Sequence, residues 1–149
     1  MLLALDQARI ALAHDEVPIG AVLYHLPTRN IIGQAHNRRI LDADPTAHAE
    51  LLAIRQGAQT LGDWRLTDTI LAVTLEPCPM CAGAIVNARI PQLVFGCADP
   101  KAGAVQTLYQ LCSDPRLNHR VQITAGVRAD ECSALLTSFF AAKRALGKK

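Results

Sequence analysis

The sequence predicts an α/β protein in which helices are layered on a sheet that contains parallel strands. Segments with apolar residues at helical spacing alternate with short apolar runs typical of strands, and the run at 69–75 is apolar almost throughout, as expected for a strand buried on both faces. The chain has 149 residues, and a chain of this length buries about two-thirds of its unfolded surface. Neither a repeat nor a low-complexity linker interrupts the sequence, so we expect a single domain over residues 1–149.

The first third of the chain predicts a helix followed by a hairpin. Leu5, Ala8 and Leu12 share one face of an amphipathic helix over residues 2–14, and Pro18 breaks the pattern. The elements expected next are a strand at 21–24, a turn at 26–30 and a return strand that begins at 31–33.

A second helix is expected to start at Asp44 and Pro45, because an acidic N-cap followed by proline at the first helical position is a typical start signal. Its apolar spacing continues to about Thr60. The remaining expected elements are a strand at 69–75, a helix from 79 to about 89, a strand at 92–97, a helix at 105–112, a short strand at 121–124 and a last helix from about 129 to 144.

Composition excludes several classes of protein. Half of the residues are hydrophobic, 19% are charged and only six are Phe, Trp or Tyr, which excludes a disordered tail, a collagen and a coiled coil. No apolar run approaches the ~18 residues that a membrane span needs. The opening segment resembles a signal peptide only briefly, since Asp6 and Arg9 interrupt it. Five cysteines, an odd number, favour reduced thiols in a cytoplasmic protein.

Charge is distributed unevenly along the chain. The net charge is +2, but residues 1–63 hold seven acids and five Lys or Arg, whereas residues 64–149 hold six acids and ten Lys or Arg. The cations Lys143, Arg144, Lys148 and Lys149 gather at the end of the last expected helix. This pattern fits a solvated helix end, where cations are favourable, and it also fits an anionic partner.

Two short segments carry the candidate chemistry: His48-Ala49-Glu50 and Pro77-Cys78-Pro79-Met80-Cys81, each near the start of an expected helix. One imidazole and two thiolates supply three ligands for tetrahedral Zn²⁺ and leave the fourth position for water. Residues two apart on a helix do not share a face, so Glu50 is a poor second ligand. It suits a proton shuttle beside the open position instead.

Other interpretations of the cysteine pair remain open at this point. A structural zinc site would need a fourth ligand, for which the candidates are Cys97, Cys112, Cys132 and His119, but none of them has tight spacing to the pair. A redox pair is less favoured, because no thioredoxin-like context surrounds it.

The same residues form the His-x-Glu and Pro-Cys-x-x-Cys signature of zinc-dependent nucleobase deaminases. Within that superfamily the chain resembles the bacterial tRNA-specific adenosine deaminases over nearly its whole length. The matching segments are 17–22, 37–38, 44–50, 74–84, 94–96, 118–121, 130–136 and 139–140. The later segments are far more specific to the tRNA enzymes than the first.

This resemblance implies a three-layer α/β/α, cytidine deaminase-like fold with a mixed central sheet of about five strands. It also implies a homodimer with one Zn²⁺ per subunit, and hydrolysis of adenosine to inosine at the tRNA wobble position. His48, Cys78 and Cys81 map onto the zinc ligands and Glu50 onto the proton shuttle, while hydroxide attacks C6 of adenine and ammonia departs.

The resemblance further implies a set of substrate-binding residues. Asn37 maps onto a contact to the flipped nucleoside, Asp99 onto a contact to the ribose or the neighbouring backbone, and Leu75 onto the base pocket. The residues that fall where the family holds the anticodon stem-loop are Lys101, Phe140, Lys143 and Arg144. A basic helix with aromatic side chains suits a splayed single-stranded loop, although Phe139 and Phe140 are equally compatible with ordinary packing.

The chain departs from the family pattern at several positions. Family members often carry extra N-terminal residues and a more arginine-rich last helix, and Ala98 stands where a basic residue is common. Two alternative functions follow from the same motifs: a deaminase of a free base or nucleoside of the guanine or cytosine type, and a zinc-stabilised RNA-binding module without catalysis.

Overall fold

The computed structural model describes residues 1–147 and alternates helices with strands along most of the chain. In chain order, the elements are α1 (Leu2–Ala13), β1 (Gly20–His25), β2 (Asn30–His36), α2 (Ala49–Leu61), β3 (Thr69–Leu75), α3 (Pro79–Asn87), β4 (Gln92–Cys97), a 3₁₀ turn (Leu111–Ser113), β5 (Gln122–Thr124) and α4 (Ala129–Ala145). No helix in this described part is long and apolar enough to cross a membrane.

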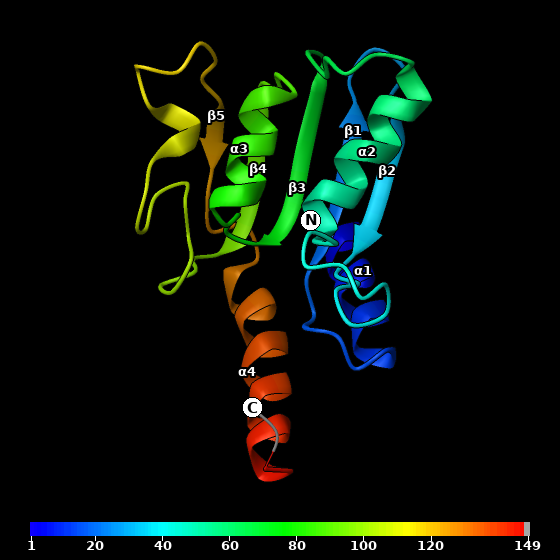
Figure 1. Ribbon diagram of the computed structural model, residues 1–149, viewed down its shortest axis with the longest axis vertical. Coiled ribbons are helices and arrows are strands. Elements are labelled where there is room, and N and C mark those ends of the chain that lie inside the picture. The colour runs from blue at the N-terminus through cyan, green and yellow to red at the C-terminus, as the bar shows by residue number, and fades with distance from the viewer. Residues whose placement is uncertain (148–149) are drawn as a thin grey trace.

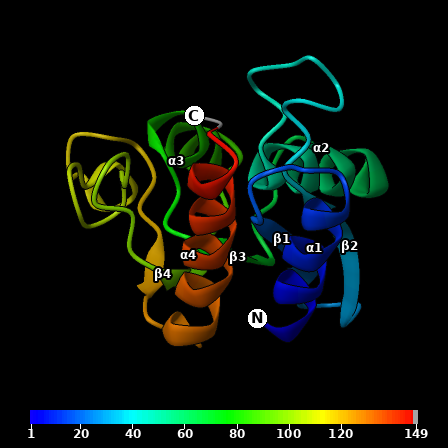
Figure 2. The ribbon, with the colours of Figure 1, turned by 90° about the horizontal axis from the view of Figure 1, so that it is seen from below.

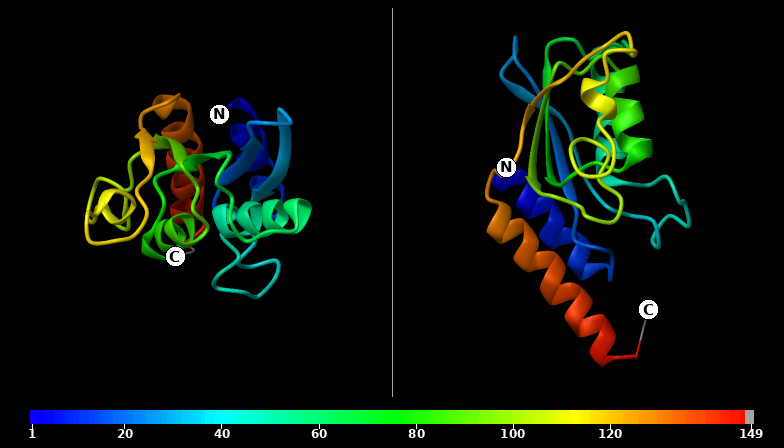
Figure 3. Two further views of the ribbon diagram at one scale, coloured as in Figure 1. Left: turned by 90° about the horizontal axis from the view of Figure 1, so that it is seen from above. Right: turned by 90° about the vertical axis from the view of Figure 1, so that its left-hand side faces the viewer.

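The central sheet has five strands in the order β2-β1-β3-β4-β5. β1 pairs antiparallel with β2 and β3, whereas β3, β4 and β5 run parallel. Figures 1, 2 and 3 show α1 and α4 on one face of the sheet and α2 and α3 on the other. The predicted three-layer α/β/α architecture with a mixed sheet of five strands is confirmed.

Buried apolar side chains of the central strands form the core between these layers. Leu71 and Val73 of β3 are fully buried, as are Leu93 of β4 and Ile85 of α3. Close backbone packing also sets the position of α2, because a Cβ on Gly33 of β2 would overlap the backbone of Ala53. The helix that begins beside His48 is therefore fixed against the sheet without intervening side chains.

The start of the second helix was predicted wrongly. α2 begins at Ala49, and His48 before it is extended, with φ −78° and ψ 146°. Asp44 does not cap a helix: its Oδ1 accepts hydrogen bonds from the N–H and the hydroxyl of Thr46, both at 2.7 Å. This local turn satisfies the carboxylate, and the backbone N–H of Arg38 donates to the carbonyl of Ala47 at 3.0 Å. Residues 37–47 therefore form a loop.

The helix expected at 105–112 is also absent. The backbone N–H groups of residues 105, 106 and 107 all donate to one carboxylate oxygen of Glu76. The carbonyl of Gly103 accepts from both Leu108 and Tyr109, at 2.9 and 3.3 Å, so the regular i to i+4 pattern does not develop. Only the short 3₁₀ turn remains of the expected helix. The other expected helices and strands are present, with modest differences at their ends.

Candidate active site

Two helix N-termini bring the three predicted metal ligands together. His48 is the N-cap of α2 and Cys78 is the N-cap of α3, with Pro79 at the first helical position and Cys81 one turn into the helix. Figure 1 shows that both helices begin at the same edge of the sheet, just beyond the carboxyl end of β3. We refer to His48, Cys78 and Cys81 as the ligand cluster.

The geometry of the ligand cluster fits a tetrahedral metal ion. Its three candidate ligand atoms all lie within 4.8 Å of one another. His48 Nδ1 lies 3.7 Å from Cys78 Sγ and 3.6 Å from Cys81 Sγ. Ordinary zinc–sulfur and zinc–nitrogen bond lengths in a tetrahedral site separate the two kinds of ligand atom by about 3.6 Å. The cluster is therefore compatible with zinc, and Nδ1 is the imidazole atom that faces the thiols.

Hydrogen bonds within the cluster favour a thiolate at Cys78. The hydrogen bond from the Cys81 thiol, together with the one from His48, lowers the pKa of Cys78 to about 4. The same hydrogen bond with Cys78, reinforced by burial, raises the pKa of Cys81. The hydrogen bond to Cys78 raises the pKa of His48. A thiolate at a helix N-terminus is further stabilised by the helix dipole, and a thiolate is the form that binds metal.

Glu50 lies beside the ligand cluster. It stands in the first turn of α2, is 4% exposed, and its side chain is hydrogen-bonded with Cys81. Burial raises the pKa of Glu50 above its usual value. A carboxyl group with a raised pKa, next to a potential metal site, is suited to accept and return a proton near neutral pH.

The loop that leads into His48 contains Asn37, and we call it the 37–47 segment. Asn37 is buried, and its Nδ2 donates to Glu16 Oε2 at 3.0 Å. The other oxygen of Glu16 accepts from the backbone N–H groups of Ile40 and Leu41, at 2.6 and 2.9 Å. Glu16 is fully buried, so this single carboxylate ties Asn37 and the following loop to the end of the turn after α1.

The loop after β4 forms a second candidate contact surface, which we call the 98–107 segment. Asp99 is half-buried and its Oδ1 accepts from the backbone N–H groups of Lys101 and Ala102, at 2.9 and 3.2 Å. Lys101 is exposed. Leu75, the last residue of β3, is half-buried and pairs with Cys97 at the end of β4. Leu75 and Cys97 end the two strands that lead to α3 and to the 98–107 segment.

A buried carboxylate holds the 98–107 segment as well. Glu76 is 2% exposed and accepts hydrogen bonds from four backbone N–H groups and one hydroxyl, those of Asp99, Val105, Gln106 and Thr107. Burial by itself raises the pKa of Glu76, but the hydrogen bonds outweigh it and lower the pKa below its usual value. Sequence reasoning assigned no role to Glu16 or Glu76; the only signal was an acidic residue directly before a Val-Pro or Pro-Cys step.

The remaining candidate substrate residues lie on α4. Figure 1 shows that this helix extends past the edge of the sheet at which α2 and α3 begin. Phe140 is 45% exposed and packs edge-to-face on Phe139, with 5.3 Å between ring centroids. Lys143 forms an ion pair with Asp15 at 2.5 Å, and Arg144 is exposed. Lys148 and Lys149 lie outside the described residues.

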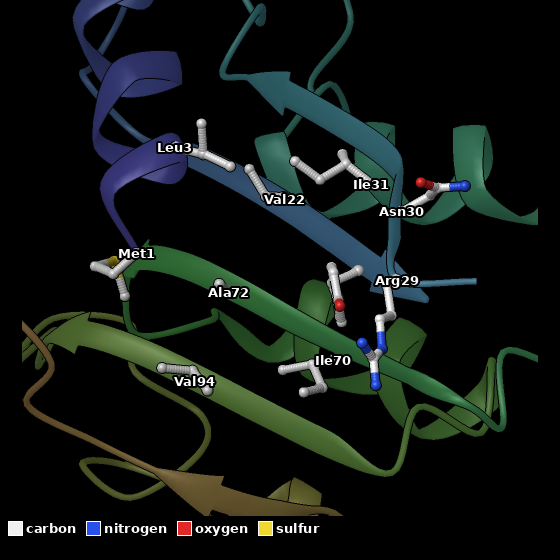
Figure 4. A pocket seen from close by; sticks show the side chains of 10 residues that line it. Met1, Leu3, Val22, Arg29, Asn30, Ile31, Ile70, Ala72 and Val94 are labelled. Carbon is white, nitrogen blue, oxygen red and sulfur yellow. The ribbon is translucent and has the colours of Figure 1, made fainter. Parts of the chain in front are cut away.

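A separate hollow of about 500 Å³ lies on the opposite face of the sheet from α2 and α3. Figure 4 shows its apolar lining from α1, β1, β3 and β4, where Leu3, Val22, Ile70 and Val94 contribute side chains. None of the candidate site residues lines it. The candidate chemistry is therefore concentrated at the strand ends and not in this hollow.

Comparison with known proteins agrees with the chemistry of the cluster. A family model described as MafB19-like deaminase matches residues 1–144. The chain is similar to the tRNA-specific adenosine deaminase of Haemophilus influenzae, at 48% identity over 144 residues that cover 97% of this chain and 83% of that protein. The tRNA-specific adenosine deaminase of Bacillus subtilis is 46% identical over 146 residues, 98% of this chain and 88% of that protein.

Solved structures extend the comparison to the fold. A structure from a study of A-to-I editing by tRNA:A34 deaminases at the wobble position of transfer RNA matches with a TM-score of 0.86 and 44% identity, over 91% of this chain and 97% of that chain. The guanine deaminase of Bacillus subtilis matches with a TM-score of 0.60 and 27% identity, over 95% and 89% of the two chains. Similarity is thus markedly greater to the tRNA deaminases than to this free-base deaminase.

Proposed function

The chain belongs to the family of MafB19-like deaminases and to that of the tRNA-specific adenosine deaminases, and we propose that it deaminates adenosine to inosine at wobble position 34 of tRNA. The observation that carries the chemistry is the meeting of His48, Cys78 and Cys81 at two helix N-termini with Glu50 buried against them. The higher identity to tRNA-acting relatives than to a guanine deaminase supports an RNA substrate.

The proposal includes one zinc ion per subunit, held by His48 Nδ1 and the sulfurs of Cys78 and Cys81. The spacing of these atoms supports this ligand set. When bound, zinc in such a site supplies a Lewis acid that lowers the pKa of water towards neutrality.

Glu50 is proposed to move the proton in the reaction. In the hydrolysis, water adds to C6 of the adenine and the exocyclic amino group leaves as ammonia. The Glu50 carboxylate takes one proton from the attacking water and passes it to N1 of the adenine, and it then carries the remaining hydroxyl proton to the departing nitrogen, so that the residue ends in the state in which it began. Its burial beside Cys81 supports this role, because it keeps the carboxyl group next to the reacting atoms and away from bulk water.

The substrate contacts are part of the proposal too. We assign the flipped nucleoside to Asn37 and Leu75, the adjoining backbone to Asp99 and Lys101, and the rest of the anticodon stem-loop to Phe140, Lys143 and Arg144. Aromatic and cationic side chains at the end of α4 suit stacking and phosphate contacts with a splayed loop. The proposal further includes one deaminase domain over residues 1–149, a homodimer, and a cytoplasmic location, which the free cysteines support.

The test is a deamination assay on the purified protein with an anticodon stem-loop that carries adenosine at position 34. Free adenosine, guanine and cytosine serve as alternative substrates, and the same stem-loop with guanosine at position 34 controls for the base. We expect inosine to form in the adenosine-34 stem-loop alone. Turnover of a free base would retain the deaminase chemistry and overturn the RNA substrate, whereas RNA binding without any turnover would favour a non-catalytic module.

A further inference from the structure

Glu76 links the strand that leads to the metal ligands with the 98–107 segment. It follows β3 directly and stands two residues before Cys78. Its backbone N–H donates to the carbonyl of Cys97 at the end of β4, at 2.9 Å, and the neighbouring carbonyl of Pro77 accepts from Ala104 at 2.8 Å. Backbone hydrogen bonds at Glu76 and Pro77 therefore fix the position of Glu76 independently of its side chain.

The side chain of Glu76 gathers donors from two parts of the 98–107 segment. Its Oε1 accepts the backbone N–H groups of Val105, Gln106 and Thr107, at 3.1, 2.7 and 2.9 Å. Its Oε2 accepts the N–H of Asp99 at 3.0 Å and the hydroxyl of Thr107. A carboxylate has two acceptor oxygens and no donor, so it satisfies five converging donors, which no neutral side chain of this size does.

Gly103 shows how closely the segment is wrapped around this carboxylate. A Cβ at this position would lie 2.5 Å from Glu76 Cδ and 2.6 Å from the carbonyl oxygen of Asp99. The N–H of Gly103 donates to that same Asp99 carbonyl at 2.9 Å. Only a residue without a side chain fits between the carboxylate and the turn that begins at Asp99.

We propose that Glu76 is a positioning residue for substrate: its carboxylate fixes the turn that presents Asp99 and Lys101 beside the ligand cluster. The consequence for Lys101 rests on the proposed function, because there Lys101 contacts the RNA backbone. The link between the two is short. Asp99 donates its N–H to Glu76 and, through Oδ1, accepts the N–H of Lys101, so displacement of Asp99 also displaces Lys101.

The test is the substitution Glu76→Gln, which keeps size and shape. An amide has one acceptor oxygen. If that oxygen keeps the three donors of residues 105–107, its NH₂ group faces the N–H of Asp99, and that hydrogen bond is lost. The Thr107 hydroxyl, which donates to the same oxygen of Glu76, can turn to accept from the NH₂ group, so the rest of the anchor stays. Leaving one such donor without a partner costs free energy that corresponds to about a tenfold change in an equilibrium constant. We expect KM for the adenosine-34 stem-loop to rise about tenfold, with zinc content unchanged and kcat within about twofold of the wild-type value.

A double-mutant cycle with Lys101→Ala separates positioning from general damage. If Glu76 acts through Lys101, the loss of stem-loop affinity caused by Lys101→Ala becomes much smaller in the Glu76→Gln background. Glu16→Gln is the matched control, because Glu16 is also a buried glutamate but contacts the 37–47 segment. Its effect should add to that of Lys101→Ala.

Three results would overturn the proposal: an unchanged KM in Glu76→Gln, additive effects with Lys101→Ala, or loss of zinc with an unchanged KM in the metal-loaded fraction. Where Glu76→Gln fails to fold, Thr107→Val decides, since it removes one donor of the same anchor and leaves the carboxylate in place: a raised KM supports the proposal and an unchanged KM overturns it. Hydrogen exchange of the Asp99 amide tests the anchor without RNA. If the Asp99 amide exchanges faster in Glu76→Gln but the wild-type protein does not deaminate the stem-loop, the proposed function is wrong. The role of Glu76 in holding the 98–107 segment would still stand.

Discussion

The ligand cluster and the two segments that flank it are held in place in different ways. His48 and Cys78 are N-caps of regular helices, so local backbone structure positions them. The 37–47 and 98–107 segments contain no helix or strand, and each is bound by one buried glutamate that is distant in sequence. Glu16 binds two backbone N–H groups and one amide, whereas Glu76 binds four backbone N–H groups and one hydroxyl.

Because of this difference, we expect the ligand cluster and the two flanking segments to have different roles in the site. Groups at helix ends are fixed by many hydrogen bonds of the helix and by packing, which suits the metal binding and proton transfer that we propose for them. A loop held by a single carboxylate depends on that one residue, which suits contacts that adapt to a substrate. Substitutions in the ligand cluster should therefore abolish the reaction, and substitutions in the glutamate anchors should mainly weaken substrate binding.

Removal of a metal ligand should have the largest effect, because it disturbs both chemistry and stability. We expect Cys81→Ala to lose zinc and turnover together. Where free zinc exceeds its Kd by about 1,000-fold, the wild-type protein gains about 4 kcal/mol of stability that this variant lacks. Elemental analysis and thermal unfolding with and without a chelator measure the two losses. Cys112→Ala is the matched control, since Cys112 is equally buried and lies outside the ligand cluster. Full activity of Cys81→Ala without zinc would contradict the proposed ligand set.

Glu50→Gln should separate catalysis from metal binding. The amide keeps the size of the side chain but cannot take up a proton, so we expect turnover to fall by about 10²–10⁴-fold. Zinc content and affinity for the stem-loop should stay near wild-type values, because Glu50 is not among the ligand atoms. Single-turnover kinetics alongside a binding titration distinguish these outcomes. Unchanged turnover would remove Glu50 from the mechanism.

The ligand cluster was predictable from sequence, because local signals determine it. Pro79 starts α3 where the sequence indicates, and this places Cys78 and Cys81 in one helical turn. The strands at 69–75 and 92–97 were likewise predictable from their apolar runs. His48 lies with the two cysteines as expected although α2 begins later than predicted, because its place directly before the helix does not depend on the earlier residues.

The flanking segments were not predictable in the same way. Asp44 and Pro45 form a helix start signal, and residues 105–112 have apolar spacing, yet neither starts an α-helix. In the first case Asp44 binds Thr46 within its own turn, and in the second the carboxylate of Glu76 takes the N–H groups. A hydrogen bond between residues about thirty positions apart leaves no periodic signal.

Glu16→Gln tests whether the 37–47 segment depends on its anchor as the 98–107 segment does. If the single amide oxygen keeps the N–H groups of Ile40 and Leu41, the NH₂ group faces Asn37 Nδ2, so the Asn37 amide must turn over. We expect KM for the stem-loop to rise about tenfold, from the cost of one poorly satisfied buried group. Steady-state kinetics with the stem-loop measure this, and Asp6→Asn, at an exposed position of α1, controls for the loss of one negative charge. An unchanged KM would mean that Asn37 does not need this orientation.

The smallest effects are expected at the end of α4, where side chains are exposed and no buried carboxylate holds a loop. Each phosphate contact of a single-stranded region contributes about 0.7 to the slope of log affinity against log salt. We expect Arg144→Ala to reduce the slope by about this amount. Lys143→Ala should reduce it less, because Lys143 is already paired with Asp15 and its Nζ lies 5.3 Å from the Phe139 ring.

Asp15→Asn sharpens this last comparison, because it removes the carboxylate that is paired with Lys143. If Lys143 is available to phosphate once it is released, the variant should bind the stem-loop more tightly at low salt and show a steeper salt slope. The gain should disappear when Lys143→Ala is combined with Asp15→Asn. Salt titrations of stem-loop binding for the four proteins of this cycle measure the coupling directly. Identical slopes in all four would exclude Lys143 from the RNA contact and leave it as a tie between α4 and the turn after α1.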